Sequence, residues 1–250
     1  MRELFAFKRG TDGVPVVFLH GFGLSHSCWA DVIGQIAPGR NLLAFDLPGH
    51  AGSLGMPHGS AAVAAKAVLA DLAARKIERA HLVGHSMGGA VAAIAALRDP
   101  KQVASLTLLA PGGFGRAIAG AVLRRYCVAT DEGELAKLMP HFFSAMHPPP
   151  AGLAASIASE HRAPGATQAL ATIVETFFDG AEQKLLPLNA LAQLAIPTRV
   201  FWGSADCILP VPSPDALPAS LRPNILEGAG HMLPNEVPDE IARVVEESCR

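Results

Sequence analysis

The sequence is short of several features that would point to whole classes of protein. Its four cysteines lie far apart and form no C-x-x-C pair, so they indicate neither a zinc knuckle nor a disulfide framework. Positive and negative side chains nearly cancel, to a formal net charge of −2, so no broad charged surface for a polyanion is indicated. We therefore expect no nucleic-acid partner and a reducing, cytoplasmic environment.

Long apolar runs are also absent. Gly, Pro, Asp or Lys interrupts every candidate before it reaches the roughly 18 residues that a membrane-spanning helix needs. The N-terminal stretch MRELFAFKRG has neither a long hydrophobic region nor a small-residue cleavage site, which argues against a signal peptide. We expect no membrane partner, and a monomer or small homo-oligomer.

Strand-like and helix-like runs alternate along most of the chain. Short apolar runs read VPVVFLH, NLLAFDLPG, AHLVGH, SLTLLAP and TRVFWG, and among them lie HSCWADVIGQIA, SAAVAAKAVLADLAARKI and GGAVAAIAALRD, which have helical length and pattern. This alternation predicts an α/β fold with a mostly parallel, doubly wound sheet. The GTDG turn between the first two strands predicts an antiparallel hairpin at the sheet edge.

The alternation stops between residues 114 and 186. This segment has the pattern of several helices without strands, interrupted by HPPPAG and RAPGA, and it is too long for a loop. We interpret it as a helical cap inserted into a core formed by residues 1–113 and 187–250.

The stretch AHLVGHSMGGAVAAIAAL places Ser86 where a strand-like run becomes a helix-like one. A serine hydroxyl becomes a good nucleophile when a rigid corner projects it toward a base, and only small residues fit two positions before and after such a corner. Gly84 and Gly88 occupy these positions and complete G-x-S-x-G, the nucleophile elbow, in the strand-turn-helix context that it requires. A serine that caps a helix after a tight turn is the alternative.

An acid and then a histidine follow the serine along the chain in this arrangement. His231, in the glycine-rich loop EGAGHMLPNE, follows the last strand, so we predict it as the base. Asp206, at the end of the strand TRVFWG, is predicted as the acid that orients the imidazole. Asp215 lies further along, in a proline-rich stretch that is typical of a surface loop.

Two backbone amides must face the substrate carbonyl oxygen as it becomes charged. We predict them at Met87, which follows the nucleophile, and at Phe22 in FLHGFG, where Gly21 and Gly23 let the backbone turn. By itself, HGFG is no more than a glycine-rich loop.

Taken together, VFLHGFG, AFDLPGHAGS, LVGHSMGGAV, VFWGSADCILP and GAGHMLPNEVP resemble the landmarks of the α/β-hydrolase superfamily in order and spacing. The resemblance spans nearly the whole chain outside the cap and implies the α/β-hydrolase fold. DLPGH, LVGHSMGGAVA, SLTLLAPGGFG and SEHRAPGA are most similar to the hydrolase-like domain of the acyltransferase component of acetoin dehydrogenase complexes, and small carboxylesterases share much of the pattern. The chain departs from the family at Ala51, where glycine is usual, and it has no lipoyl-bearing segment, so we expect a stand-alone hydrolase.

These residues predict a serine hydrolase that cleaves a small carboxylic ester, thioester or lactone through an acyl-enzyme. Its partners would be a small-molecule acyl substrate and water, with no cofactor and no metal. The spacing of His81 and His85 is a weak metal signal that no third ligand completes, and no G-x-G-x-x-G follows a strand. A carbon–carbon bond hydrolase or a cofactor-free perhydrolase would use the same triad, whereas a non-catalytic ligand-binding protein on this fold would not need all three residues.

We expect the cap to cover a largely apolar pocket. Candidate substrate contacts are the aromatic residues of the cap and the methionine beside the base, namely Phe114, Tyr126, Phe142, Phe143 and Met232. The alternative is that these residues form the core of the cap. Arg124, Arg125 and Arg162 could include a clamp for a substrate carboxylate, or could lie on solvated helix faces.

Overall fold

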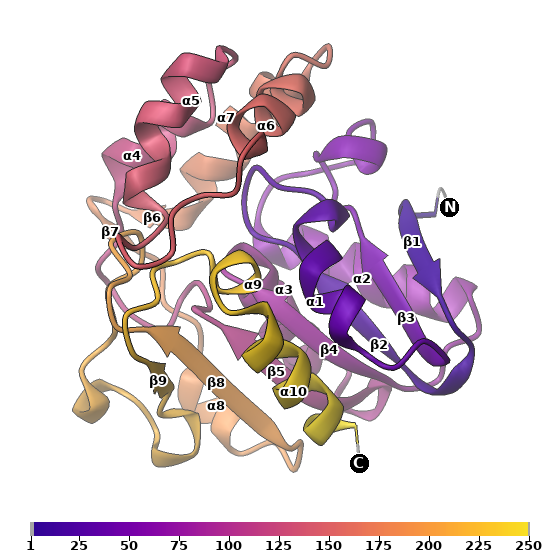
Figure 1. Ribbon diagram of the computed structural model, residues 1–250. Helices are drawn as coiled ribbons and strands as arrows, with labels where there is room; N and C mark the ends of the chain where they lie inside the picture. Colours follow the sequence, from indigo (N-terminus) through magenta and orange to yellow (C-terminus); the bar gives the residue numbers. More distant parts are fainter. Residues whose placement is uncertain (1–2, 250) are drawn as a thin grey trace.

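A computed structural model describes residues 3–249, and within that range the core is a seven-stranded sheet in the order β1-β3-β2-β4-β5-β8-β9 (Figure 1). The strands are β1 (Ala6–Arg9), β2 (Asp12–Leu19), β3 (Arg40–Phe45), β4 (Ala80–His85), β5 (Val103–Leu109), β8 (Thr198–Gly203) and β9 (Asn224–Leu226). β1 runs antiparallel to β3, and the other neighbouring pairs are parallel. The mostly parallel sheet predicted from the alternation is confirmed.

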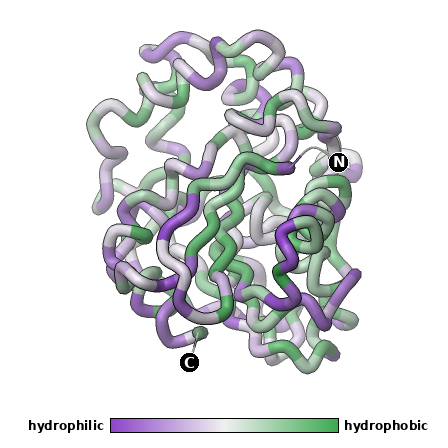
Figure 2. The backbone as a smooth tube through the Cα atoms, turned by 90° about the vertical axis from the view of Figure 1, so that its right-hand side faces the viewer, coloured by the Kyte–Doolittle hydropathy of each residue, from purple (hydrophilic) through white to green (hydrophobic). Residues whose placement is uncertain are grey.

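The central strands are buried on both faces. Leu19 of β2, Leu82 of β4 and Leu106 of β5 are fully buried, and Figure 2 shows hydrophobic segments running through the middle of the molecule. Continuous apolar strands of this kind are expected where helices cover both faces of a parallel sheet.

Helices cover the two faces of the sheet. α1 (Ala30–Gln35) and α10 (Pro238–Ser248) pack together on one face, and α2 (Ala61–Ala74), α3 (Met87–Arg98) and α8 (Leu188–Ala192) lie on the other (Figure 1). Short helices in the connections are η1 (His26–Trp29), η2 (Ala51–Ser53), η3 (Pro100–Gln102), η6 (Pro214–Ala216), η7 (Ala219–Leu221) and α9 (Leu233–Glu236).

The predicted hairpin between the first two strands is wrong. β1 pairs with β3, in a register that runs from Ala6 opposite Phe45 to Arg9 opposite Leu42. The reason is that both edges of β2 are occupied, since Val16 aligns with Leu42 of β3 on one side and with β4 on the other. The GTDG turn therefore carries the chain from the sheet edge past β3 rather than into an adjacent strand.

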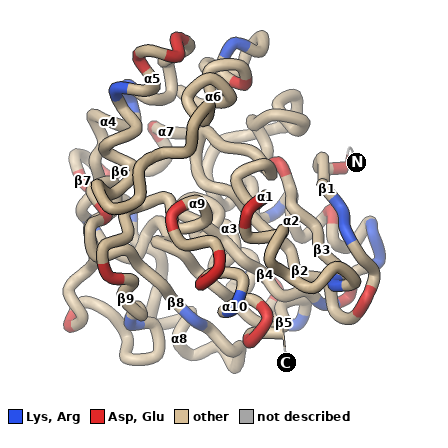
Figure 3. Tube along the Cα trace, in the orientation of Figure 1, with Lys and Arg blue, Asp and Glu red and all other residues tan. Residues whose placement is uncertain are grey.

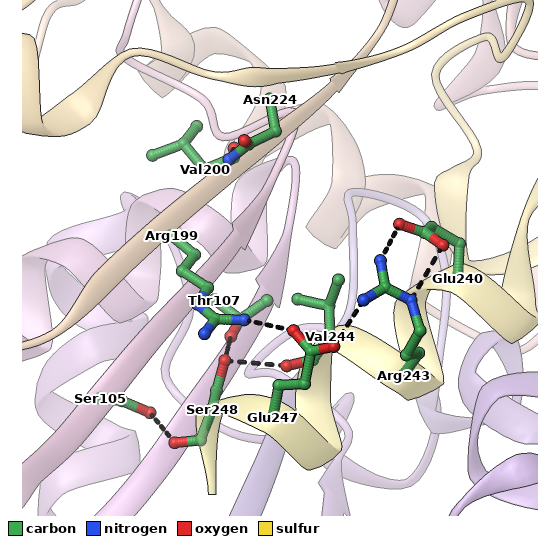
Figure 4. Close-up of polar contacts among 10 residues, drawn as sticks. All are labelled: Ser105, Thr107, Arg199, Val200, Asn224, Glu240, Arg243, Val244, Glu247 and Ser248. Carbon is green, nitrogen blue, oxygen red and sulfur yellow. Dashed lines mark hydrogen bonds and ion pairs between the residues drawn. The ribbon is translucent and has the colours of Figure 1, made fainter. Parts of the chain in front are cut away.

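Helix α10 is fastened to the sheet by polar contacts (Figure 4). Arg199 of β8 donates a hydrogen bond to Glu247 at 2.9 Å, and Thr107 of β5 donates one to the Ser248 hydroxyl at 3.3 Å. Arg243 forms ion pairs with Glu240 and Glu247 along the helix surface. The contacts to Arg199 and Thr107 tie the chain that follows His231 to two strands of the core.

Residues 114–186 form a separate group of helices. They are α4 (Gly120–Tyr126), α5 (Glu132–Leu138), η4 (Met139–His141), α6 (Leu153–His161), α7 (Ala166–Val174) and η5 (Glu175–Phe177), followed by the strands β6 (Phe178–Asp179) and β7 (Glu182–Gln183). Figure 1 shows α4–α7 at the end of the sheet toward which the arrowheads of β3 and β8 point. The β6–β7 pair was not expected from the sequence. It forms because Gly180, with φ +63°, occupies the first position of the two-residue loop between Asp179 and Glu182 and lets the chain fold back.

Charged side chains lie mainly outside the sheet centre. Figure 3 shows them along α10, on the cap helices and around β1, whereas β4 and β5 carry no Lys, Arg, Asp or Glu. Within residues 3–249, no helix combines the length and apolarity needed to cross a lipid bilayer.

Ala51, at the position where the resemblance leads us to expect glycine, has a strained backbone conformation. Its φ of +37° lies in the left-handed region, where a Cβ costs roughly 1–2 kcal/mol. Because glycine gains entropy in the unfolded chain, A51G should stabilise the fold by a smaller amount, about 0.5–1 kcal/mol, and raise Tm by roughly 2–3 °C. The matched control A70G, inside α2, should lower Tm. A lower Tm for A51G in thermal unfolding would contradict this account.

Candidate active site

The nucleophile elbow is a close contact between backbone segments. β4 ends at His85, Ser86 has φ +52° and ψ −114°, and α3 begins at Met87. A Cβ on Gly84 would lie 2.3 Å from the Gly88 carbonyl oxygen, and a Cβ on Gly88 would lie 2.1 Å from the Leu19 carbonyl oxygen. Only glycine fits at these two positions, as the motif predicts, and Ser86 is held in a backbone conformation that costs about 1–3 kcal/mol.

Asp206 and His231 form a buried hydrogen-bonded pair. The His231 Nδ1–H donates to Asp206 Oδ2 at 2.7 Å, and the side chains are 0% and 4% exposed for Asp206 and His231. Asp206 Oδ1 accepts hydrogen bonds from the Ile208 and Leu209 amides, both at 2.9 Å, which fixes the carboxylate. Nε2 is then the ring nitrogen of His231 that remains to accept a proton.

Two cavities meet at Ser86 in the described part of the chain. The large cavity has a volume of about 240 Å³ and is lined by Met87, Ala90, Ile94, Leu186 and Leu209, among others. The small cavity has a volume of about 20 Å³ and brings Ser86 together with His231. Asp215, the alternative acid, is exposed in η6 and lines neither cavity.

The predicted oxyanion amides flank Ser86. Phe22 and Met87 both line the large cavity, and within residues 3–249 neither backbone N–H donates a hydrogen bond. Hydrogen bonds to two histidines hold the Phe22 loop. Gly23 N–H donates to His50 Nε2 at 3.1 Å, and the Gly21 carbonyl accepts from His20 Nδ1 at 2.7 Å. Two free N–H groups beside the serine are a suitable arrangement for binding an oxyanion.

Buried histidines around this loop are neutral. Burial lowers the pKa of the His50 ring to about 4 and that of His85 to about 3, and it lowers the pKa of His20 well below its usual range. His85 Nε2–H donates to the His231 carbonyl at 2.8 Å, whereas His81 Nδ1 bonds to the Ser105 hydroxyl. The two histidines of the weak metal signal therefore serve separate protein contacts.

The structure divides the predicted substrate contacts into two groups. Phe142, Phe143, Met232 and Tyr126 line the small cavity. Phe114 lines neither cavity, because it is buried in the core with its ring 6.4 Å from that of Trp202.

The arginines of the predicted clamp also lie elsewhere. Arg124 pairs with Glu175, Arg125 pairs with Glu134, and Arg162 donates to the Thr130 carbonyl. None of the three arginines lines the cavities at Ser86 in the described part of the chain. This arrangement favours the solvated helix faces that the sequence left open as the alternative.

Apart from Ser86, Phe22 and Met87, the residues of the large cavity were not identified from the sequence. Ser86, Ala90 and Ile94 lie four residues apart, so a helix that starts at the nucleophile places them on one face. That spacing was the available signal. Ile118, Phe177 and Leu186, which also line the cavity, come from the cap segment and its junction with the core, where no periodic pattern marks them.

Glu236 was also missed. Its buried carboxylate accepts hydrogen bonds from the amides on both sides of His231, Gly230 at 2.8 Å and Met232 at 2.9 Å, and from the Ser144 amide at 3.1 Å. Glu236 thus joins the histidine loop to the cap. The signal was an acid five residues after the predicted base, which reads as an ordinary first-turn acid of a helix.

The sequence model of the alpha/beta hydrolase family matches residues 16–244, and the chain belongs to this family. It is 32% identical over 235 residues to the dihydrolipoyllysine-residue acetyltransferase component of the acetoin cleaving system of Cupriavidus necator, and 33% identical over 233 residues to that of Pseudomonas putida. Both resemblances predicted from the motifs are confirmed.

These two relatives are longer than the chain that matches them. The alignments cover 90% and 93% of this chain but 60% and 62% of the relatives. Among solved structures, a membrane phospholipase A described as a bacterial virulence factor has a TM-score of 0.82 at 27% identity, covering 97% of this chain and 81% of that one. The chain therefore shares its fold with that phospholipase.

The neutral histidines predict a loss of stability in acid. Below about pH 6.5 the unfolded chain binds protons that the folded chain excludes, so the free energy of unfolding falls with pH toward the folded-state pKa, about 4 for His50. His50 should account for about 2 kcal/mol of the loss between pH 7 and pH 5. Urea unfolding of H50Q should show a loss smaller by this amount, and the exposed-site control H141Q should match the wild type. Equal losses in H50Q and wild type would refute the assignment.

Glu236 should be necessary for the rigidity of the histidine loop. E236Q keeps the shape of the side chain but replaces one of the two acceptor oxygens with an NH₂ group. At least one buried backbone N–H then loses its hydrogen-bond acceptor. We expect the free energy of unfolding to fall by about 1–3 kcal/mol in denaturant titrations. The exposed-site control E227Q should match the wild type. Wild-type stability in E236Q would show that the carboxylate contacts contribute little.

Proposed function

We propose that this protein is a serine hydrolase that cleaves a carboxylic ester with Ser86 as nucleophile, His231 as base and Asp206 as the orienting acid. One observation carries the assignment: the His231–Asp206 hydrogen bond of 2.7 Å engages Nδ1 and leaves Nε2 as the free ring nitrogen of a histidine that lines the same cavity as Ser86. Membership of the alpha/beta hydrolase family supports it.

Acylation begins with proton transfer. As Ser86 Oγ attacks the ester carbonyl carbon, its proton moves to His231 Nε2, and the carbonyl oxygen becomes an oxyanion that accepts hydrogen bonds from the Phe22 and Met87 amides. The C–O bond to the alcohol then breaks, and the imidazolium gives its proton to the leaving alkoxide. Asp206 stabilises the imidazolium while it exists.

Deacylation repeats these steps with water as nucleophile. His231 takes a proton from water, the resulting hydroxide attacks the acyl carbon, and Ser86 leaves with the proton returned by the imidazolium. The products are the acid and the regenerated serine. These steps use only groups of the chain, the substrate and water.

The cavity lining favours a neutral ester over the carbon–carbon bond alternative. Ring-cleavage diketones of that reaction carry a carboxylate, which calls for a buried cationic partner. Lys184 is the charged residue in the lining of the large cavity, and it is exposed, whereas Ile94, Ile118 and Leu123 give the cavity an apolar character.

The nucleophile can be tested by covalent labelling. An alkyl fluorophosphonate should add one adduct to the protein, mapped to Ser86 by peptide mass spectrometry. S86A should take up no adduct and should hydrolyse alkyl esters on the order of 10³-fold more slowly or worse, as followed by acid release in a pH-stat. The control S220A, at an exposed serine, should behave like the wild type.

Two results would count against the proposed function. Labelling at another residue would reject the site assignment. An unlabelled wild-type protein without esterase activity, folded as judged by circular dichroism, would favour the non-catalytic ligand-binding alternative.

A further inference from the structure

The two cavities at Ser86 differ about twelvefold in volume, about 240 Å³ against about 20 Å³. Ser86, Phe22 and Leu123 line both, so the cavities meet at the nucleophile. The acyl and alcohol parts of a bound ester must extend from the reacting carbon in different directions. The volume of one cavity therefore limits the size of the acyl part, and the volume of the other limits the size of the alcohol part.

The position of His231 decides which part enters which cavity. Among the described lining residues, His231 belongs to the small cavity and not to the large one. Its Nδ1 is committed to Asp206, so Nε2 must deliver the proton to the leaving alkoxide. The alcohol oxygen has to lie beside Nε2, which places the alcohol part in the small cavity and leaves the large cavity for the acyl chain.

The volumes then set the sizes of the two parts. A cavity of roughly 150 Å³ holds a benzene molecule, and a water needs roughly 10–15 Å³. By this scale the large cavity accepts an apolar group of about six to ten carbon atoms, and the small cavity accepts a group of about the size of water or methanol.

We infer that the substrates are esters of a medium-chain or phenylalkanoic acid with a very small alcohol. This assignment rests on the proposed function and specifies its substrate class.

Cap residues keep the small cavity small. Met139, Phe142 and Ile157 fill the space around His231, and each is less than 10% exposed. The backbone of this region is pinned, because the Phe142 carbonyl accepts hydrogen bonds from the His231 and Met232 amides at 2.9 and 3.2 Å. Tyr126 also ties the cap to the Phe22 loop by donating to the Gly23 carbonyl at 3.0 Å. These contacts hold in place the cap residues that limit the volume beside His231.

A pair of isomeric esters tests the orientation directly. Methyl octanoate and heptyl acetate have the same atoms and similar hydrophobicity but place the long chain on opposite sides of the ester. We expect kcat/KM for methyl octanoate to exceed that for heptyl acetate by at least about tenfold, in a pH-stat with the wild-type protein. Equal values, or a preference for heptyl acetate, would overturn the inference.

Variants that change the volume of either cavity give a second test. I157A enlarges the small cavity and should raise kcat/KM for butyl octanoate relative to methyl octanoate by about tenfold, and M139A serves the same purpose if I157A does not fold. I94W fills the large cavity and should lower kcat/KM for methyl octanoate relative to methyl acetate by a similar factor. The control V128A, at a cap residue that is 58% exposed, should leave both ratios at their wild-type values. Unchanged ratios in folded I157A and I94W would reject the assignment of the two parts.

Failure of this inference and failure of the proposed function are distinguishable. If an alkyl fluorophosphonate labels Ser86 but heptyl acetate is the better ester, the hydrolase stands and the orientation is wrong. If Ser86 is not labelled and neither ester is cleaved, the proposed function itself fails.

Discussion

The contact of Gly88 with the Leu19 carbonyl oxygen is the constraint on which the site depends. It brings the start of α3 against the end of β2, so that Ser86 and the Phe22 loop emerge side by side from neighbouring parallel strands. A methyl group at Gly88 would separate them. The free amide of Met87, the loop that carries Phe22 and the strained backbone of Ser86 all follow from this one close approach.

The other half of the site is assembled by contacts between the core and the cap. His231 follows a short edge strand, β9, and the carbonyl of Phe142, from the cap, accepts hydrogen bonds from the loop that carries it. The neighbouring Glu236 carboxylate binds the same loop and also accepts a hydrogen bond from the Ser144 amide of the cap. The serine side is therefore set by backbone sterics within the core, whereas the histidine side is set by polar contacts across two layers.

This difference explains what the sequence could and could not predict. The parallel sheet, the elbow and its two glycines leave local patterns, because each depends on residues a few positions apart. The pairing of β1 with β3 depends on which strand edges are free after the sheet has formed, which the GTDG turn does not encode. Phe114 has the aromatic side chain expected of a pocket residue but packs near Trp202 in the core. The residues that line the large cavity come from distant segments that meet only in the fold.

The residues that line the two cavities also bear on how the substrate preference of such an enzyme can diverge. Cap residues line part of both cavities, with Met139 and Ile157 at the small one and Ile118 and Phe177 at the large one, whereas the elbow and its glycines belong to the core. Substitutions in the cap can thus alter the preference for either end of the substrate without disturbing the strained backbone of Ser86 or the glycines of the elbow. Gene duplicates of this chain could acquire new alcohol preferences through cap mutations while inheriting the catalytic geometry unchanged.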